Sequence, residues 1–173
     1  ISACLVGSEM CIRDRPRLVR EDTFAMAVDA GMRNICCGVE SGSSRIRRKI
    51  LKRNYRDEHV ENVFKLAHKH KIRCSSFNII GLPDEDREDI FDTINLNKRV
   101  KPTSATVTFF HPYRGAPLRK LCVERGYIET NQGKHEDVYR SDSQLNMPQT
   151  TKQELKNLMH SFQLYMKLPE EYH

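Results

Sequence analysis

From residue 17 onward, the sequence alternates between short strand-like runs and longer segments with a helical hydrophobic period. Residues 34–39, 72–80 and 104–110 are expected to be strands, and the first is apolar enough to be buried on both faces. Strands that alternate with helices are joined by right-handed crossovers into a parallel sheet. Because a closed eight-stranded barrel needs more than about 200 residues, the sequence predicts an α/β protein, either a small open sheet or part of a larger barrel.

Helices are expected wherever apolar residues recur three or four positions apart. These segments are residues 22–30, 43–50, 84–100 and 118–125, with two more that begin at residues 57 and 151. The last of them opens with a capping box, Thr151 to Glu154. Residues 129–147 are polar and are expected to form a loop.

The composition excludes membrane-spanning proteins, because no apolar run approaches the roughly 20 residues that a span needs. The net charge is +6, from 29 Lys and Arg against 23 Asp and Glu. This charge is compatible with an anionic ligand or with nucleic acid, but a solvated basic surface explains it equally well.

Six cysteines occur, at positions 4, 11, 36, 37, 74 and 122, and no two of them form a CxxC pair. Cys36 and Cys37 are adjacent, so in a strand their side chains point to opposite faces and cannot easily share one metal ion. We therefore expect free, reduced thiols, no metal ligands and a cytoplasmic protein.

Polar and conformationally special residues follow each predicted strand. In parallel α/β folds, the carboxyl ends of the strands form one edge where ligands bind. After the first strand, the carboxylate of Glu40 can accept hydrogen bonds from both hydroxyls of a ribose, and Ser41 adds a hydroxyl. Helix capping by the serines at positions 43 and 44 is the alternative interpretation of this turn.

Further candidates follow in chain order. Arg53 ends a basic run that is mostly solvated surface, but its guanidinium can pair with a ligand carboxylate. Gly81, Leu82 and Pro83 follow the second strand, and they either let a flat ring approach the backbone or simply end the strand. His111 follows the third strand and is a candidate base or ligand, or else a structural histidine.

Taken together, residues 38–43 (GVESGS), 50–53 (ILKR) and 78–83 (NIIGLP) resemble the radical S-adenosylmethionine (SAM) superfamily. The resemblance is strongest to its cobalamin-binding-type branch of Fe–S oxidoreductases, and Glu85, residues 110–118 and the ending at residues 168–172 also fit. It implies a partial parallel (β/α) barrel with about three to four strands and flanking helices. The predicted strands would be the fourth to sixth strands of that barrel.

The resemblance also implies the site. Glu40 and Ser41 would contact the SAM ribose, and Arg53 would face the methionyl carboxylate. Gly81, Leu82 and Pro83 would lie near the adenine, and His111 near the adenine or the substrate. The cofactors would be SAM and, in the intact parent, a 4Fe–4S cluster. The resemblance also allows cobalamin in the intact parent, and it leaves the catalytic residues and the substrate unassigned.

Departures from the family concern its metal-binding motifs. The CxxxCxxC motif that holds the cluster is absent, as is the DxHxxG cobalamin signature, and Lys71 stands at a helix stop where the family usually has Gly. Residues 4–15 closely resemble a translated sequencing-adaptor read. We therefore expect an artefactual or disordered tail at residues 1–16, a partial barrel at 17–126, and a loop with a C-terminal helix at 127–173.

These expectations describe the C-terminal half of a radical SAM enzyme, inactive without the N-terminal half of its barrel as partner. Two other functions stay open. The basic residues at 45–53 fit an RNA-binding or RNA-modification module, although no aromatic stacking platform accompanies them. Alternatively, the chain is a small α/β protein that binds a nucleotide through Glu40 and Ser41.

Overall fold

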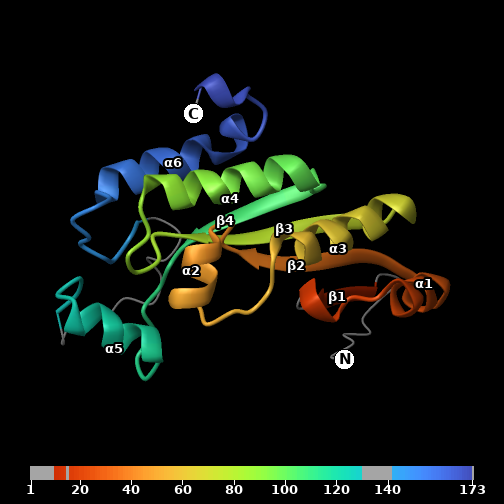
Figure 1. The fold of residues 1–173 in the computed structure, drawn as a ribbon, viewed down its shortest axis with the longest axis horizontal. Helices are drawn as coiled ribbons and strands as arrows, with labels where there is room; N and C mark the ends of the chain where they lie inside the picture. The colour runs from red at the N-terminus through yellow and green to blue at the C-terminus, as the bar shows by residue number, and fades with distance from the viewer. Residues whose placement is uncertain (1–9, 15, 130–141, 173) are drawn as a thin grey trace.

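The computed structural model describes residues 10–14, 16–129 and 142–172, and its centre is a four-stranded parallel sheet in the order β1-β2-β3-β4 (Figure 1). The strands are β1 (Met10–Asp14), β2 (Met32–Glu40), β3 (Arg73–Ile80) and β4 (Ser104–Phe109). The α-helices are α1 (Glu21–Asp29), α2 (Ser44–Lys49), α3 (Asp57–Lys69), α4 (Arg87–Val100), α5 (Pro117–Glu124) and α6 (Lys152–Tyr165). Two short 3-10 helices are η1 (Pro16–Leu18) and η3 (Glu170–Tyr172). The predicted parallel, open α/β sheet is therefore present.

One strand lies where we expected a tail. Residues 10–14 pair in parallel with β2, from Met10 opposite Met32 to Asp14 opposite Cys37, and Pro16 is buried. The expected artefactual or disordered tail therefore contains a strand at residues 10–14, whose backbone is hydrogen-bonded to β2. Their apolar residues do not alternate with polar ones, so no strand was expected there, and their pairing with β2 is irregular between Met10 and Cys11. The rest of the expected tail, residues 1–9 and 15, lies outside the described residues.

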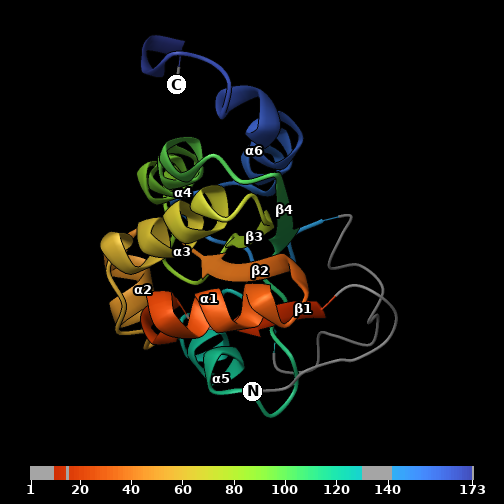
Figure 2. The ribbon, with the colours of Figure 1, turned by 90° about the vertical axis from the view of Figure 1, so that its right-hand side faces the viewer.

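The two faces of the sheet differ. Along β2, Ile35, Cys37 and Val39 are buried, whereas the alternate residues Cys36 and Gly38 are half-buried. Among the described elements, α3 and α4 lie together on one side of the sheet (Figure 2). The expectation that this strand is buried on both faces was therefore wrong, because these helices cover the buried face alone.

A polar network crosses the covered face between β3 and α4. The Ser76 hydroxyl donates to Asn97 Oδ1 at 2.5 Å, and Asn97 Nδ2 donates to Asn78 Oδ1 and to the Thr93 carbonyl, both at 2.8 Å. All four residues are almost completely buried. Since buried polar groups must find partners, this network fixes one register of α4 on β3.

Helix ends follow the predicted local signals. Thr151 and Glu154 form the expected capping box of α6, and Asp86 and Asp89 form another at the start of α4. Lys71, at the expected helix stop after α3, adopts a left-handed conformation with φ 55°. A lysine tolerates this region at a cost that glycine would avoid.

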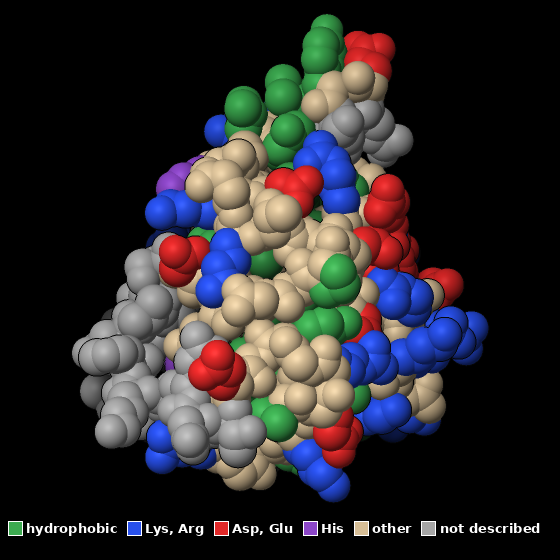
Figure 3. Space-filling model, turned by 90° about the vertical axis from the view of Figure 1, so that its left-hand side faces the viewer, with side chains coloured by type: hydrophobic (Ala, Val, Ile, Leu, Met, Phe, Trp, Pro, Cys, Tyr) green, Lys and Arg blue, Asp and Glu red, His purple; other side chains and the backbone are tan. Residues whose placement is uncertain are grey.

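The C-terminal segment packs on the rest of the fold. The side chains of Leu155, Leu158 and Phe162 from α6 join the core formed by α4, β4 and α5. Gln163 Nε2 also donates to the Ala105 carbonyl of β4 at 2.6 Å. Figure 3 shows hydrophobic side chains at the end of the molecule where α6 and η3 lie, and Leu164 is 56% exposed there. Among the described residues, no helix is both long and apolar enough to cross a membrane.

We predict that Phe162→Ala lowers the free energy of unfolding by about 3–5 kcal/mol, because it removes a fully buried ring and leaves a cavity. Leu164→Ala on the same helix is the matched control and should change the free energy by less than about 0.5 kcal/mol. Urea denaturation of the three proteins measures both values. Equal losses in the two variants would show that α6 does not pack as described.

Candidate functional site

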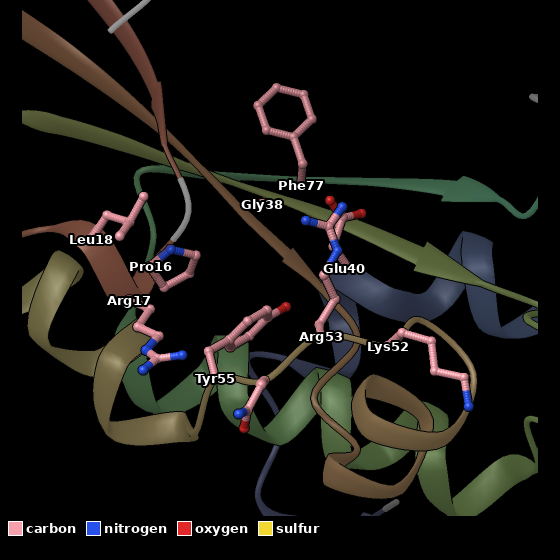
Figure 4. Close-up of a pocket in the computed structure, with 10 residues that line it drawn as sticks. Pro16, Arg17, Leu18, Gly38, Glu40, Lys52, Arg53, Tyr55 and Phe77 are labelled. Carbon is pink, nitrogen blue, oxygen red and sulfur yellow. The ribbon is translucent and has the colours of Figure 1, made fainter.

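A cavity of about 820 Å³ opens at the carboxyl ends of β1 and β2 (Figure 4). It is lined by Pro16, Arg17, Leu18, Gly38, Glu40, Lys52, Arg53, Asn54, Tyr55 and Phe77. These residues come from η1, from β2 and β3, and from the loop between α2 and α3. Its volume is in the range of small-molecule sites, and the carboxyl edge of a parallel sheet is where such sites form.

Glu40 ends β2 in an unusual conformation that turns its side chain toward the cavity. Its φ is 60°, and the Ser41 N–H donates to the Val39 carbonyl at 2.7 Å, which makes a γ-turn centred on Glu40. The pairing with β3 shifts register between Gly38 and Glu40. A Cβ on Gly38 would lie 3.0 Å from Glu40 Oε1, so the carboxylate lies over a position that glycine leaves empty.

Positive charge surrounds this carboxylate, and Figure 4 shows the Arg53 side chain extending toward Glu40. Arg53 follows α2. Its backbone N–H donates to the Arg47 carbonyl at 2.8 Å, and this hydrogen bond turns the chain back toward the sheet. Among the described lining residues, Arg17, Lys52 and Arg53 are basic and Glu40 is the sole acid. The cavity therefore suits a ligand that combines a carboxylate with hydroxyl donors.

Two aromatic side chains complete the lining. The Tyr55 hydroxyl donates to the Val39 carbonyl, and burial raises the pKa of this phenol, which therefore stays protonated as the donor. Phe77 of β3 pairs in register with Gly38 and also lines the cavity, and Figure 4 shows its ring pointing away from Tyr55. Neither Tyr55 nor Phe77 was predicted as a site residue. Phe77 could have been, because it alternates with Ile79 and so lies on the same face of β3.

Ser41 does not line the cavity. It is completely buried, with its hydroxyl 3.4 Å from Thr93 Oγ1 and accepting the Ser43 N–H at 3.2 Å. Ser43 accepts the Ile46 N–H and caps α2, as the alternative interpretation of this turn held. The serines therefore shape the turn behind Glu40.

The residues after β3 and β4 lie at the same carboxyl edge but outside the lining of this cavity. Gly81 has φ 74°, and a Cβ there would lie 3.2 Å from Leu155 Cδ1 of α6. Leu82 and Pro83 are buried, and the ring of His111 packs edge-on against Tyr113 with centroids 4.5 Å apart. The structure thus brings Glu40 and Arg53 to one cavity and leaves Gly81, Leu82, Pro83 and His111 beyond it.

Glu85 holds the turn after β3. Its Oε2 accepts the N–H groups of Gly81 at 2.6 Å and Leu82 at 3.1 Å, and the side chain is completely buried. Burial raises the pKa of this carboxyl to about 8, against the opposing effect of the two N–H donors. Between pH 4.5 and about 8, the Glu85 carboxyl is therefore protonated in the folded protein, whereas it is ionised in the unfolded chain.

Thiol ligands for a metal cluster are not gathered in the described part of the chain. There, Cys37, Cys74 and Cys122 are buried, Cys36 is half-buried, and no group of three His, Cys, Asp or Glu residues could hold a metal ion. Burial raises the pKa of Cys122 to about 11, which disfavours the thiolate that ligation needs. These residues therefore do not fit an iron–sulfur cluster.

Comparison with known proteins identifies the family. The sequence model of the radical SAM superfamily matches residues 4–96, more than half of the chain. The chain belongs to the radical SAM superfamily. The match includes the segment that we expected to be a tail, and it confirms the superfamily inferred from the motifs around Glu40 and Gly81.

Curated relatives are longer proteins than this radical SAM chain. It is 37% identical over 81 residues to tRNA-2-methylthio-N(6)-dimethylallyladenosine synthase of Ehrlichia ruminantium, covering 46% of this chain and 18% of that protein. It is 30% identical over 102 residues to an uncharacterized methyltransferase of Pyrococcus horikoshii, covering 59% and 22%. The chain therefore spans about a fifth of the length of these relatives.

Solved structures share the fold of this radical SAM chain at low sequence identity. Coproporphyrinogen III oxidase (HemN) from Escherichia coli aligns with a TM-score of 0.62 and 18% identity over 90% of this chain and 31% of that one. TsrM from Kitasatospora setae, with cobalamin and a [4Fe-4S] cluster bound, aligns with a TM-score of 0.58 and 17% identity over 68% and 22%. The open parallel sheet thus matches part of a radical SAM barrel, as predicted.

We predict that the difference in free energy of unfolding between the wild type and Glu85→Gln depends on pH. The wild type should lose stability relative to the variant as pH rises from about 4.5 to about 8. The sign follows from the raised pKa, because the folded state then binds the proton that the unfolded state has lost. The difference should change by about 1.4 kcal/mol for each pH unit in this window. Urea titrations at pH 5 and 8.5 measure it, and a difference independent of pH would contradict the assignment.

Proposed function

We propose that the chain forms the side of a radical SAM domain that binds the nucleoside and the amino-acid carboxylate of SAM. The observation that carries this proposal is the shared cavity of Glu40 and Arg53 at the carboxyl edge of the sheet. A carboxylate that accepts ribose hydroxyls and a guanidinium that pairs with a carboxylate match the two polar ends of SAM. Phe77, which lines the same cavity, offers an apolar face to the ligand.

The other predicted contacts extend this proposal along the edge of the sheet. Gly81, Leu82 and Pro83 follow the neighbouring strand and are proposed to lie near the adenine, with Leu155 of α6 filling the space beside the Gly81 Cα. His111 follows the next strand and is proposed to face the adenine or the substrate. Ser41 contributes by holding the turn of Glu40, because its hydroxyl is used within the protein.

In the superfamily, SAM supplies a 5′-deoxyadenosyl radical for hydrogen abstraction when an iron–sulfur cluster provides the electron. The residues of this chain would bind and orient SAM and exclude water from it. Since the 173 residues contain no CxxxCxxC motif, we propose that the chain by itself does not cleave SAM. Cobalamin is a possible further cofactor, supported by the similarity to TsrM, whose structure contains it. We propose that the partner of this chain is the N-terminal half of a barrel. We also propose that the protein is located in the cytoplasm.

RNA binding is the second candidate function. The curated relative with 37% identity is named as a tRNA-modifying enzyme, and Arg48, Lys49 and Lys52 are exposed around α2. One observation argues against RNA binding. On the face shown in Figure 3, Lys and Arg side chains are interspersed with Asp and Glu, whereas an RNA backbone attracts positive charge. An RNA complex whose affinity falls steeply with salt would favour this candidate over binding of a small ligand alone.

We predict that the chain binds S-adenosylhomocysteine, and that Glu40→Gln and Arg53→Met each weaken binding about 10- to 100-fold, the range expected for a lost charged hydrogen bond. Isothermal calorimetry measures the affinities. Glu88→Gln and Arg48→Met are the matched controls, because they make the same charge changes at exposed positions. Tighter binding of ATP than of S-adenosylhomocysteine would instead favour a general nucleotide-binding protein.

We also predict that anaerobic reconstitution with iron and sulfide yields no stoichiometric cluster and no cleavage of SAM. The reason is the absence of the cluster motif and the burial of Cys37, Cys74 and Cys122. Absorbance spectra and chromatography of the products measure the two outcomes. A stoichiometric cluster accompanied by 5′-deoxyadenosine would contradict the proposed inactivity.

A further inference from the structure

We infer that Tyr55 and Arg47 act as positioning residues that clamp the γ-turn of Glu40 and thereby aim its carboxylate into the cavity. The inference rests on the proposed function, because the purpose assigned to the clamp is ligand binding by Glu40. It concerns two residues that the motif resemblance does not include. Arg47 in particular belongs to the basic run that we expected to be mostly solvated.

The turn itself requires support. A non-glycine residue at φ 60° in the centre of a γ-turn is rare and strained, and it persists only where its surroundings hold it. Such residues gather at functional sites. The register shift between Gly38 and Glu40 marks the same place as a bulge that re-aims a side chain.

The clamp contacts the two carbonyl groups that flank Glu40. The Tyr55 hydroxyl donates to the carbonyl of Val39, and Arg47 Nη1 donates to the carbonyl of Ser41 at 3.1 Å. The guanidinium of Arg47 lies over the Tyr55 ring, 5.2 Å from its centroid. The two clamp residues therefore support each other while each holds one side of the turn.

The burial of Arg47 is difficult to explain by packing alone. Its side chain is 1% exposed, and it pairs with Asp57, the first residue of α3. An apolar side chain of similar volume often replaces a buried ion pair without loss of stability. What such a side chain cannot supply is the hydrogen bond to the Ser41 carbonyl.

The turn is also fixed from the side of α4. The N–H of Gly42 donates to Thr93 Oγ1 at 2.7 Å, and a Cβ on Gly42 would lie 2.3 Å from the Asp92 carbonyl oxygen. The loop therefore has no room to shift toward α4. Together with the hydrogen bonds from the clamp residues, this contact holds the carboxylate of Glu40 in one place before any ligand arrives, which lowers the entropy cost of binding.

The first test is a double-mutant cycle on affinity for S-adenosylhomocysteine, measured by calorimetry. Tyr55→Phe and Arg47→Met should each weaken binding about 5- to 20-fold in the wild type, as one lost hydrogen bond permits, and less than about 2-fold in a Glu40→Gln background. Tyr127→Phe is the control, because it removes a hydroxyl hydrogen bond to Asp84 away from the cavity. Equal losses in both backgrounds would overturn a role through Glu40.

The second test needs no ligand and keeps the two proposals separate. Hydrogen exchange of the Ser41 amide, which donates to the Val39 carbonyl, should accelerate at least about 10-fold in Tyr55→Phe and Arg47→Met, while amides of α6 exchange at wild-type rates. Unchanged exchange at Ser41 would overturn the clamp. A wild type that binds no S-adenosylhomocysteine would overturn the proposed function, and the exchange rates would still decide the clamp.

Discussion

The turn at the end of β2 is the constraint on which the site depends. Holding Glu40 at φ 60° costs about 1–3 kcal/mol, the range for a residue in a sparsely populated conformation. The hydrogen bonds from Tyr55, Arg47 and Gly42 around it each contribute about 0.5–1.5 kcal/mol, with more where a charge takes part. Their sum is enough to offset the strain. The carboxylate can therefore stand over Gly38 without a ligand to hold it there.

The buried polar network between β3 and α4 extends this constraint into the core. Thr93 joins the two, because its carbonyl accepts from Asn97 in the network and its hydroxyl accepts from Gly42 beside the turn. A shift of α4 would thus break hydrogen bonds at both places. Since unpaired polar groups in the interior are costly, the packing of the core and the shape of the cavity are set together.

Local patterns predicted most elements and part of the site, and distant contacts decided the rest. The strands at residues 34–39, 72–80 and 104–110 and the capping box at Thr151 were predictable from sequence, because each depends on neighbouring residues. The place of Glu40 at the carboxyl edge followed from the rule for parallel sheets, and that of Arg53 from the family resemblance. The burial of Ser41 was not predictable, because it depends on Thr93, 52 residues away.

A crystal structure of the chain with S-adenosylhomocysteine would show whether the turn at Glu40 binds the ligand. We expect ribose hydroxyls within hydrogen-bond distance of the Glu40 carboxylate and the amino-acid carboxylate beside the Arg53 guanidinium, with φ of Glu40 still positive. A ligand seated away from this cavity, or Glu40 in an extended conformation with its carboxylate turned from the ribose, would contradict this expectation.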